Sequence, residues 1–463
     1  MINTFQNKKK LLYKVLFSSY ILSFLAFLFW SDFPLPHGDD LFFAGTAVHY
    51  ADTGEFENPG VYEYTAHFSE IRKPYWFVPL HMRSLGWWIG ITDASDQWIR
   101  IYVLVCVAIT TIFLILWAQK KCDKPFIFLW TLPIIVAFGF RWSLRPECTA
   151  IPLLIIGAFV LSLEPSRKST WVGISFFGLS SLASQIMVIP SACLIIGHFW
   201  IFLRKSSWKE PCLQITIGVV QTLCIGICLI NFEIDKFLTM FFDHVNNRSS
   251  SVSANLSFLY FMSCKLGNGY LLRLPSFLML IFLCISMLRS ERKNKPLIIS
   301  LVTSILLMSM TYAKSFELIL FLVTLSTILI LFTSRRLQIP FTLMLTLLLF
   351  VRQGTHLLAY DMFCDRKKNF ETISIKDKQT YVIDEYVIRH PLDWKFPKNW
   401  KIAPDFYTTN DRLLNKPDSE TWLISLKNLS YFYPDIYQQK KLTIGNKEFT
   451  NLPQKYWEYK LLP

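Results

Sequence analysis

Two adjacent carboxylates follow the first apolar run of the chain, in the stretch PLPHGDDLFFAGTAVHYADTGEF (residues 34–56). Asp39 and Asp40 have no lysine or arginine downstream of them until Arg72. A carboxylate can take the proton from an attacking hydroxyl or amine, as a general base does. Aspartate is also a favoured helix cap, because its side-chain oxygen accepts a hydrogen bond from a free backbone N–H group. The two roles are compatible, and the sequence leaves both open.

Basic side chains recur at the ends of later apolar runs. They are Arg72 and Lys73 in EIRKPYW, Arg145 in FRWSLRPECTA, Lys314 in TYAKSFEL and Arg352 in FVRQGTHLL. Such cations can bind a phosphate and stabilise the negative charge that develops on it as it leaves. We therefore expect transfer of a group from a phosphate-linked donor. The candidate catalytic residues are Asp39, Asp40 and Glu147, and the five cations are candidate ligands of the donor phosphate.

Simpler explanations exist for several of these charges. Arg72 and Lys73 could be ordinary interfacial charges, and Arg352 could extend its long side chain to the membrane interface. Arg145 and Glu147 could form a local salt bridge that closes a tight turn. Ionisable groups at membrane depth are costly, however, and usually face a cavity or each other. The sequence therefore keeps them as candidates.

The elements that must position these residues are apolar helices. The chain has 463 residues, is 52% hydrophobic and 16% aromatic, and has a mean hydropathy of +0.35. Repeated apolar runs of nearly membrane-spanning length indicate a polytopic membrane protein. Eleven runs are expected to span the membrane: 11–30, 98–117, 125–140, 149–163, 170–183, 187–203, 211–232, 271–288, 296–312, 318–333 and 340–358. The stretch 170–203 could instead be one long helix.

Charge asymmetry sets the orientation of these spans. The segments expected inside carry eighteen basic and four acidic residues, whereas the first outer loop, 31–97, carries ten acidic and three basic residues. This is the asymmetry of the positive-inside rule. It places the N-terminus in the cytoplasm, and an odd number of spans places the C-terminus and all the candidate site residues outside. The net charge of +14 then reflects topology, so no nucleic-acid partner is expected.

The fold expected is all-α across residues 1–358, with a small extracytoplasmic α/β domain at 359–463. Outer loop 31–97 should hold two interfacial helices, at 40–51 and 78–89, and Gly54 should end the first. The second outer loop, 233–270, is rich in serine and asparagine at its centre and is expected to be mobile there. In the tail, TYVID (380–384) and TWLIS (421–425) read as strands, and LTIGNKEFT (442–450) reads as a hairpin.

Several of these stretches resemble the GT-C superfamily of polyprenyl-phosphate-dependent glycosyltransferases. DDLFFAGTAVHYADTGEF is similar to its first outer loop, and RKPYWFVPLHMRSLGWWIG to its second interfacial stretch. RPE at Arg145–Glu147 resembles a second acidic site, and YAKSFELIL an outer turn that supplies a lysine. GLSSLASQIMVIP resembles a segment that often carries lysine where this chain has Gln185. Protein mannosyltransferases and aminoarabinose transferases are the most similar in style, although Asp40 stands where glutamate is common.

The resemblance implies an inverting membrane glycosyltransferase with Asp39 as the general base. It would move a sugar from a polyprenyl-phosphate donor to a glycan, lipid or protein acceptor on the outer face, as expected for the periplasmic side of a bacterial inner membrane. The branch resembled implies no metal cofactor, although Asp39, Asp40 and Glu147 could hold Mg²⁺ or Mn²⁺ through oxygen ligands. A glycan polymerase or ligase that uses lipid-linked substrates is the main alternative. A lipid-linked saccharide flippase is the other, but the sequence shows no charges near the bilayer midplane and no repeated halves.

Overall fold

The computed structural model describes most of the helical region and the strands of the tail. The described residues are 14, 18, 38–60, 73–75, 77–121, 133, 144–162, 167–203, 208–248, 295–311, 338–347, 380–384, 400–403, 420–425, 443–444, 447–448 and 459–462. The chain divides into two compact units. The first comprises residues 1–34, 75–81 and 103–357, and the second comprises residues 35–74, 82–102 and 358–463. Each is described by itself.

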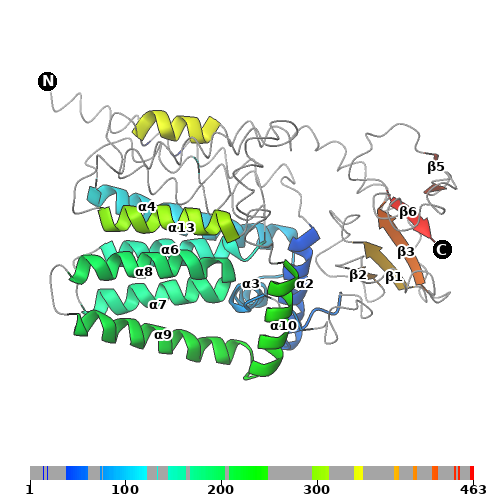
Figure 1. Cartoon of the computed structure of the whole chain (residues 1–463). Helices are drawn as coiled ribbons and strands as arrows, with labels where there is room; N and C mark the ends of the chain where they lie inside the picture. Colours follow the sequence, from blue (N-terminus) through cyan, green and yellow to red (C-terminus); the bar gives the residue numbers. More distant parts are fainter. Residues whose placement is uncertain are drawn as a thin grey trace. The chain divides into compact units, whose positions relative to one another are not determined.

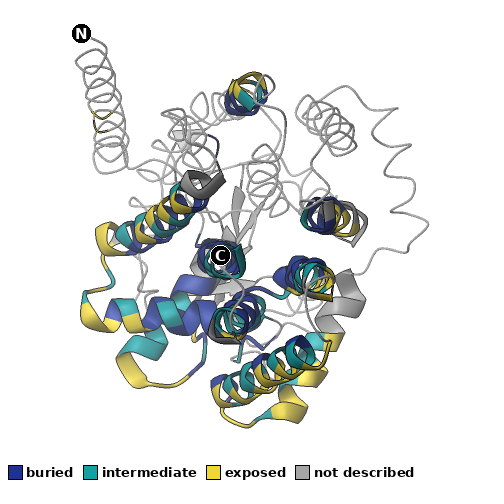
Figure 2. Ribbon diagram, turned by 90° about the vertical axis from the view of Figure 1, so that its left-hand side faces the viewer, coloured by how far each residue is buried: buried dark blue, intermediate teal, exposed yellow. Residues whose placement is uncertain are grey.

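The first unit contains a bundle of apolar helices that run alongside one another (Figure 1). Its labelled members are α4 (Asp96–Lys121, which enters this unit at Val103), α6 (Glu147–Ser162), α7 (Arg167–Ala183), α8 (Val188–Leu203), α9 (Lys209–Leu229) and α13 (Lys295–Thr311). Helix α7 packs between α6 and α9, and α8 packs on α13. Along the bundle, exposed residues lie on the outward side of α9, the lowest helix in Figure 2.

Close packing of α6 on α7 depends on two glycines. A Cβ at Gly157 would lie 2.9 Å from the Gly173 carbonyl oxygen, and a Cβ at Gly173 would lie 3.2 Å from the Gly157 carbonyl oxygen. Ser180 on α7 also donates a 2.7 Å hydrogen bond to the Ala150 carbonyl on α6. Small residues that let backbones touch, together with hydroxyls that bond across helices, are typical of helix pairs within membranes.

Among the described helices, two segments are long and apolar enough to cross a bilayer, Gln97–Trp117 of α4 and Lys209–Leu229 of α9. Shorter apolar helices cover Glu147–Ser162, Ser169–Ala183, Gln185–Ile201 and Gln338–Leu347. These match predicted runs in position. The runs 11–30, 125–140, 271–288 and 318–333 fall almost entirely outside the described residues, so the predicted total of eleven spans stays a prediction.

The stretch 170–203 forms two helices. Helix α7 ends at Ala183, Ser184 is extended (φ −145°, ψ 124°), and a short 3₁₀ turn, η2 (Gln185–Met187), leads into α8. Pro190 lies in the first turn of α8, where its missing N–H has no intrahelical partner to lose. In one continuous helix the same proline would lack its hydrogen bond to the carbonyl of residue 186 and clash with it.

A sharp corner joins α9 to α10 (Ile234–Arg248), which runs across the direction of the bundle (Figure 1). We define the α9–α10 corner as residues 230–233. Asn231 and Phe232 are left-handed there, with φ of 52° and 62°, and the Phe232 N–H donates to the Ile227 carbonyl at 3.0 Å. The predicted second outer loop, 233–270, therefore contains a helix at 234–248 that the sequence did not predict. The serine-rich residues 249–270 lie outside the described residues.

The second unit contains α2 (Gly38–Thr53) and most of α3 (Leu80–Ile91), so the two helices predicted in the first outer loop are confirmed with bounds shifted by about two residues. Gly54 ends α2 with φ +77°, a conformation that glycine adopts without strain. The helices approach at Gly86, where a Cβ would lie 3.0 Å from the Ala47 carbonyl oxygen. Arg83 then reaches over the Tyr50 ring, 4.9 Å from its centroid.

The tail forms a four-stranded sheet of order β2-β1-β3-β6 and a separate hairpin. The strands are β1 (Thr380–Asp384), β2 (Trp400–Ala403), β3 (Glu420–Ser425), β4 (Thr443–Ile444), β5 (Lys447–Glu448) and β6 (Tyr459–Leu462). Strand β1 pairs in parallel with β2 and β3, and β6 closes on β3 antiparallel. The predicted strands at 380–384 and 421–425 and the hairpin at 442–450 are confirmed. The segments in which helices of an α/β domain were expected lie outside the described residues.

Candidate functional site

The α6 turn, defined here as residues 144–149, places two charged side chains inside the protein. Arg145 is 9% exposed and Glu147 is 2% exposed. Pro146 starts the helix, because its carbonyl accepts hydrogen bonds from the N–H groups of Thr149 and Ala150. Proline suits this place because the first N–H groups of a helix have no intrahelical acceptor. The sequence Arg-Pro-Glu thus forms a tight helix start that buries both charges.

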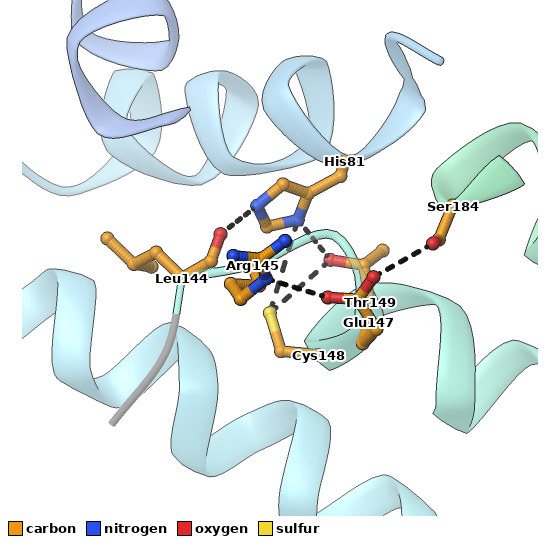
Figure 3. A network of polar contacts seen from close by, with 7 residues as sticks. All are labelled: His81, Leu144, Arg145, Glu147, Cys148, Thr149 and Ser184. Carbon is orange, nitrogen blue, oxygen red and sulfur yellow. Dashed lines mark hydrogen bonds and ion pairs between the residues drawn. The ribbon is translucent and has the colours of Figure 1, made fainter. Parts of the chain in front are cut away.

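Glu147 joins two separate parts of the bundle. Its carboxylate lies 3.5 Å from Nε of Arg145, and Ser184 donates a 3.1 Å hydrogen bond to it (Figure 3). Ser184 is the extended residue between α7 and α8, so the helix break aims its hydroxyl at this acid. A buried carboxylate needs such partners, because an ion removed from water without them costs several kcal/mol.

His81, the second residue of α3, hydrogen-bonds to both ends of the α6 turn. Its Nε2 contacts the Leu144 carbonyl, and its Nδ1 lies 2.8 Å from the Thr149 hydroxyl (Figure 3). A carbonyl only accepts, so Nε2 carries the proton in the neutral ring and Thr149 donates to Nδ1. Burial lowers the pKa of His81 to about 4, with a further lowering by the nearby Arg145 charge, while the hydrogen bond to Leu144 acts in the opposite direction. His81 is therefore neutral at pH 7.

Gln185 lies directly beside this network, in the 3₁₀ turn that follows Ser184. Its Oε1 atom is buried and has no hydrogen-bond partner within the described part of the chain. This is the position at which the GT-C resemblance leads one to expect lysine. An amide there carries no positive charge, unlike the lysine expected from the resemblance.

The structure thus brings two predicted site residues, Arg145 and Glu147, into direct contact. Asp39 and Asp40 lie in the first turn of α2, which begins at Gly38. The structure describes their backbone but not their side chains. Lys73 is half-buried and precedes Pro74 in the second unit. Three predicted phosphate ligands, Arg72, Lys314 and Arg352, lie outside the described residues. A cavity shared by Asp39, Arg145 and Lys314 therefore stays a prediction.

Sequence reasoning missed His81, Thr149 and Ser184. The signal for His81 was a lone histidine within the apolar segment FVPLHM, where a buried polar ring must find partners. Thr149 and Ser184 carried no such signal, because hydroxyls are common in helices of this kind. All three hold the α6 turn in place through hydrogen bonds, without adding a charge.

One group of possible metal ligands occurs in the part of the chain that the structure describes. His49, Glu55 and Glu57 each place one ligand atom within 4.8 Å of the others. The Glu55 side chain is 71% exposed and lies 4.0 Å from His49, as an ordinary surface pair would. Glu147 is not a member of this group, and the side chains of Asp39 and Asp40 lie outside the described part of the chain, so the question of Mg²⁺ or Mn²⁺ at these acids stays a prediction.

Comparison with known proteins identifies the fold. No protein-family profile and no curated protein sequence matches the chain. Among solved structures, it is similar to ArnT from Cupriavidus metallidurans in the apo state, with a TM-score of 0.55 and 11% identity over 96% of this chain and 97% of that one. It is also similar to the same protein bound to undecaprenyl phosphate, with a TM-score of 0.53 and 11% identity over 90% and 95%. The chain therefore has the fold of ArnT over nearly its whole length, and this is the fold that the resemblance of the sequence to aminoarabinose transferases led us to expect.

Proposed function

We propose that this protein is a membrane glycosyltransferase that uses a polyprenyl-phosphate-linked sugar as its donor. The observation that carries the proposal is the buried Arg145–Glu147 pair, which lies at the turn singled out by the GT-C resemblance. It occurs in a fold shared with ArnT from Cupriavidus metallidurans, whose structure has been determined with undecaprenyl phosphate bound. The donor's lipid tail would lie in the bilayer and its phosphate at the outer interface.

The reaction follows from the groups assigned. A hydroxyl or amine of a glycan, lipid or protein acceptor attacks the anomeric carbon of the sugar as its proton passes to Asp39. The bond between that carbon and the phosphate oxygen breaks on the opposite side, so the configuration inverts and polyprenyl phosphate leaves. Asp40 orients Asp39 or the acceptor. The cations Arg72, Lys73, Arg145, Lys314 and Arg352 are proposed to stabilise the phosphate charge.

Glu147 and its partners have a positioning role in this scheme. Arg145 has a long, flexible side chain, and its contact with Glu147 restricts the guanidinium before any substrate arrives. Ser184 and His81 restrict the acid and the turn in the same way. A donor group held in advance stabilises developing charge without reorganising during the reaction. The same scheme puts the site on the periplasmic side, with the N-terminus in the cytoplasm and the C-terminus outside.

The Asp39→Asn variant tests the proposal. Asparagine keeps nearly the same shape and caps helices about as well as aspartate, but it cannot accept the proton. Loss of a general base typically lowers the rate by about 10²–10⁴-fold. We expect the purified variant to elute and melt like the wild type, to bind undecaprenyl phosphate, and to lose nearly all sugar transfer from a panel of polyprenyl-phosphate sugars.

The matched control is Asp40→Asn, which removes the neighbouring charge and should have a milder effect. Transfer at the wild-type rate in Asp39→Asn would overturn its assignment as the base. An inactive Asp40→Asn variant beside an active Asp39→Asn variant would keep the reaction and reassign the base. Wild-type protein that neither binds undecaprenyl phosphate nor consumes any such donor would refute the proposed function itself.

A further inference from the structure

Helix α9 presents an apolar surface along the bundle that no other described helix covers. Of its 21 residues, only Pro211, Gly218 and Leu229 are buried. Its exposed side chains include Leu213 (57%), Ile217 (42%), Val220 (53%) and Leu223 (59%). In an integral membrane protein, such a face contacts lipid. The surface does not end with α9, because Phe232 at the α9–α10 corner is 70% exposed.

Helix α10 continues that apolar surface in a new direction. One side of α10 faces the protein: the Phe237 ring lies 6.2 Å from Tyr75 edge to face and stacks on Phe241 at 5.5 Å. Next to this side lies a stripe of three exposed apolar side chains, Ile234 (41%), Leu238 (42%) and Phe242 (55%). Their spacing of four residues puts them in one row along the helix.

The remaining side of α10 is polar. Asp235, Lys236 and Thr239 are all exposed there, and Lys236 lies 4.0 Å from Glu233 at the start of the helix. The helix therefore has three sectors, one against the protein, one apolar and exposed, and one polar and exposed. An amphipathic helix that lies in a membrane interface has this division, with its apolar sector in the acyl-chain boundary and its polar sector in water.

Tyr75 fixes the orientation of α10, which runs across the direction of the bundle. Its hydroxyl lies 2.6 Å from Oε2 of Glu233 and 3.1 Å from the Ile230 carbonyl, so it bonds to both sides of the α9–α10 corner. Because these contacts hold the corner, α10 cannot rotate so that the stripe packs against the bundle. The stripe stays exposed beyond the end of α9.

We propose that the stripe of Ile234, Leu238 and Phe242 is a membrane-contact surface, and that its partner is the phospholipid leaflet into which α9 emerges. Three large apolar side chains in one row are an unusual surface to leave in water. The same row is continuous with the lipid-facing side of α9 through Phe232. We favour the bilayer over a protein partner because the stripe extends along the helix and a polar sector borders it directly. This is the division of an amphipathic helix that lies in a membrane interface.

Photocrosslinking of the full-length protein in lipid nanodiscs tests this surface. The probe is a benzophenone amino acid placed at Leu238 or, separately, at Phe242, in nanodiscs of phosphatidylcholine and phosphatidylglycerol with tritiated acyl chains. Lys236 is the matched control, because it is an exposed residue of the same helix that lies in the polar sector. We expect the Leu238 and Phe242 positions to incorporate at least fivefold more labelled phospholipid than the Lys236 position.

Each of three other outcomes would overturn the proposal and would assign the stripe to different surroundings. Equal labelling at Leu238, Phe242 and Lys236 would mean that the stripe lies in water. A covalent dimer without labelled lipid would assign the stripe to a second copy of the chain. Labelling by added undecaprenyl phosphate, with no phospholipid adduct, would assign it to the lipid tail of a substrate. The two probe positions guard against one variant that fails to fold, and none of these readouts depends on glycosyltransferase activity.

Discussion

Two turns in the first unit are contacted by the same short stretch of chain, residues 75–81, yet their surroundings are opposite. The α6 turn is buried and charged, and His81 bonds to its Leu144 carbonyl and Thr149 hydroxyl. The α9–α10 corner carries exposed, left-handed residues, and Tyr75 bonds to its Glu233 carboxylate and Ile230 carbonyl. A histidine thus supports the turn that holds a charge in the interior, and a tyrosine supports the turn that faces outward.

The comparison of the two turns indicates where the loss of a hydrogen bond lowers stability most. At the α6 turn, water cannot replace a missing partner, so the group left behind stays buried and unsatisfied. At the α9–α10 corner, the Glu233 side chain is 26% exposed, so water or lipid headgroups can reach its carboxylate when the Tyr75 hydroxyl is removed. The same kind of contact should therefore contribute more to stability in the first place than in the second.

The largest effect is expected from Glu147→Ala. The change removes the acid that lies 3.5 Å from the buried Arg145, and breaking a buried ion pair from one side typically costs about 3–5 kcal/mol. We expect a strongly lowered melting temperature in detergent. The double change Arg145→Leu with Glu147→Leu should melt closer to the wild type, because no buried charge is then left over. A single variant as stable as the wild type would show that the pair carries no such penalty.

His81 should make the stability of the protein depend on pH. Its pKa is about 4 in the folded chain and 6.5 when unperturbed, so the unfolded chain binds more protons between these values. The free energy of unfolding should then fall as pH drops from 6.5 to 4, by on the order of 3 kcal/mol, and stop falling below pH 4. Melting curves across this range measure the drop.

The control for this measurement is His81→Gln, which keeps a donor and an acceptor but does not titrate. The difference between the wild type and this variant isolates the contribution of His81 from that of other acid-sensitive groups. Parallel pH profiles for the two proteins would contradict the assignment of a neutral, buried histidine.

A smaller effect is expected from Tyr75→Phe at the α9–α10 corner. The variant keeps the ring that packs on Phe237 and removes only the hydroxyl. Because Glu233 remains partly exposed, the loss should be about 1 kcal/mol. Its melting temperature should lie between those of Glu147→Ala and the wild type. A loss as large as that of Glu147→Ala would remove the distinction between the two turns.

The sequence predicted the elements better than it predicted the contacts between them. Apolar length was sufficient to locate α4 and α9, and short continuous apolar runs located β1 and β3. Helix α10 was missed because its polar and apolar residues are mixed, and the serine-rich segment after it favoured a loop. The break at Ser184 was left open, since Pro190 permits either a kinked helix or a new one.

At the site, sequence patterns indicated the charges but not their partners. Arg145 and Glu147 could be singled out because charges are rare in apolar surroundings. His81 precedes them by more than sixty residues, and Ser184 follows Glu147 by 37, so only the folded bundle brings these side chains together. The role of Asp39 rests on the resemblance and stays a prediction.

Residues 75–81, which contact both turns, also limit the insertions and deletions that this part of the chain can accept. Tyr75 and His81 bond to turns that belong to different helices, so the number of residues between them is set by the distance those turns impose. An insertion or deletion of one residue would leave only one of the two side chains in register with its turn. Residues 75–81 should therefore tolerate substitution more readily than any change of length, whereas the serine-rich segment after α10 should accept added residues freely.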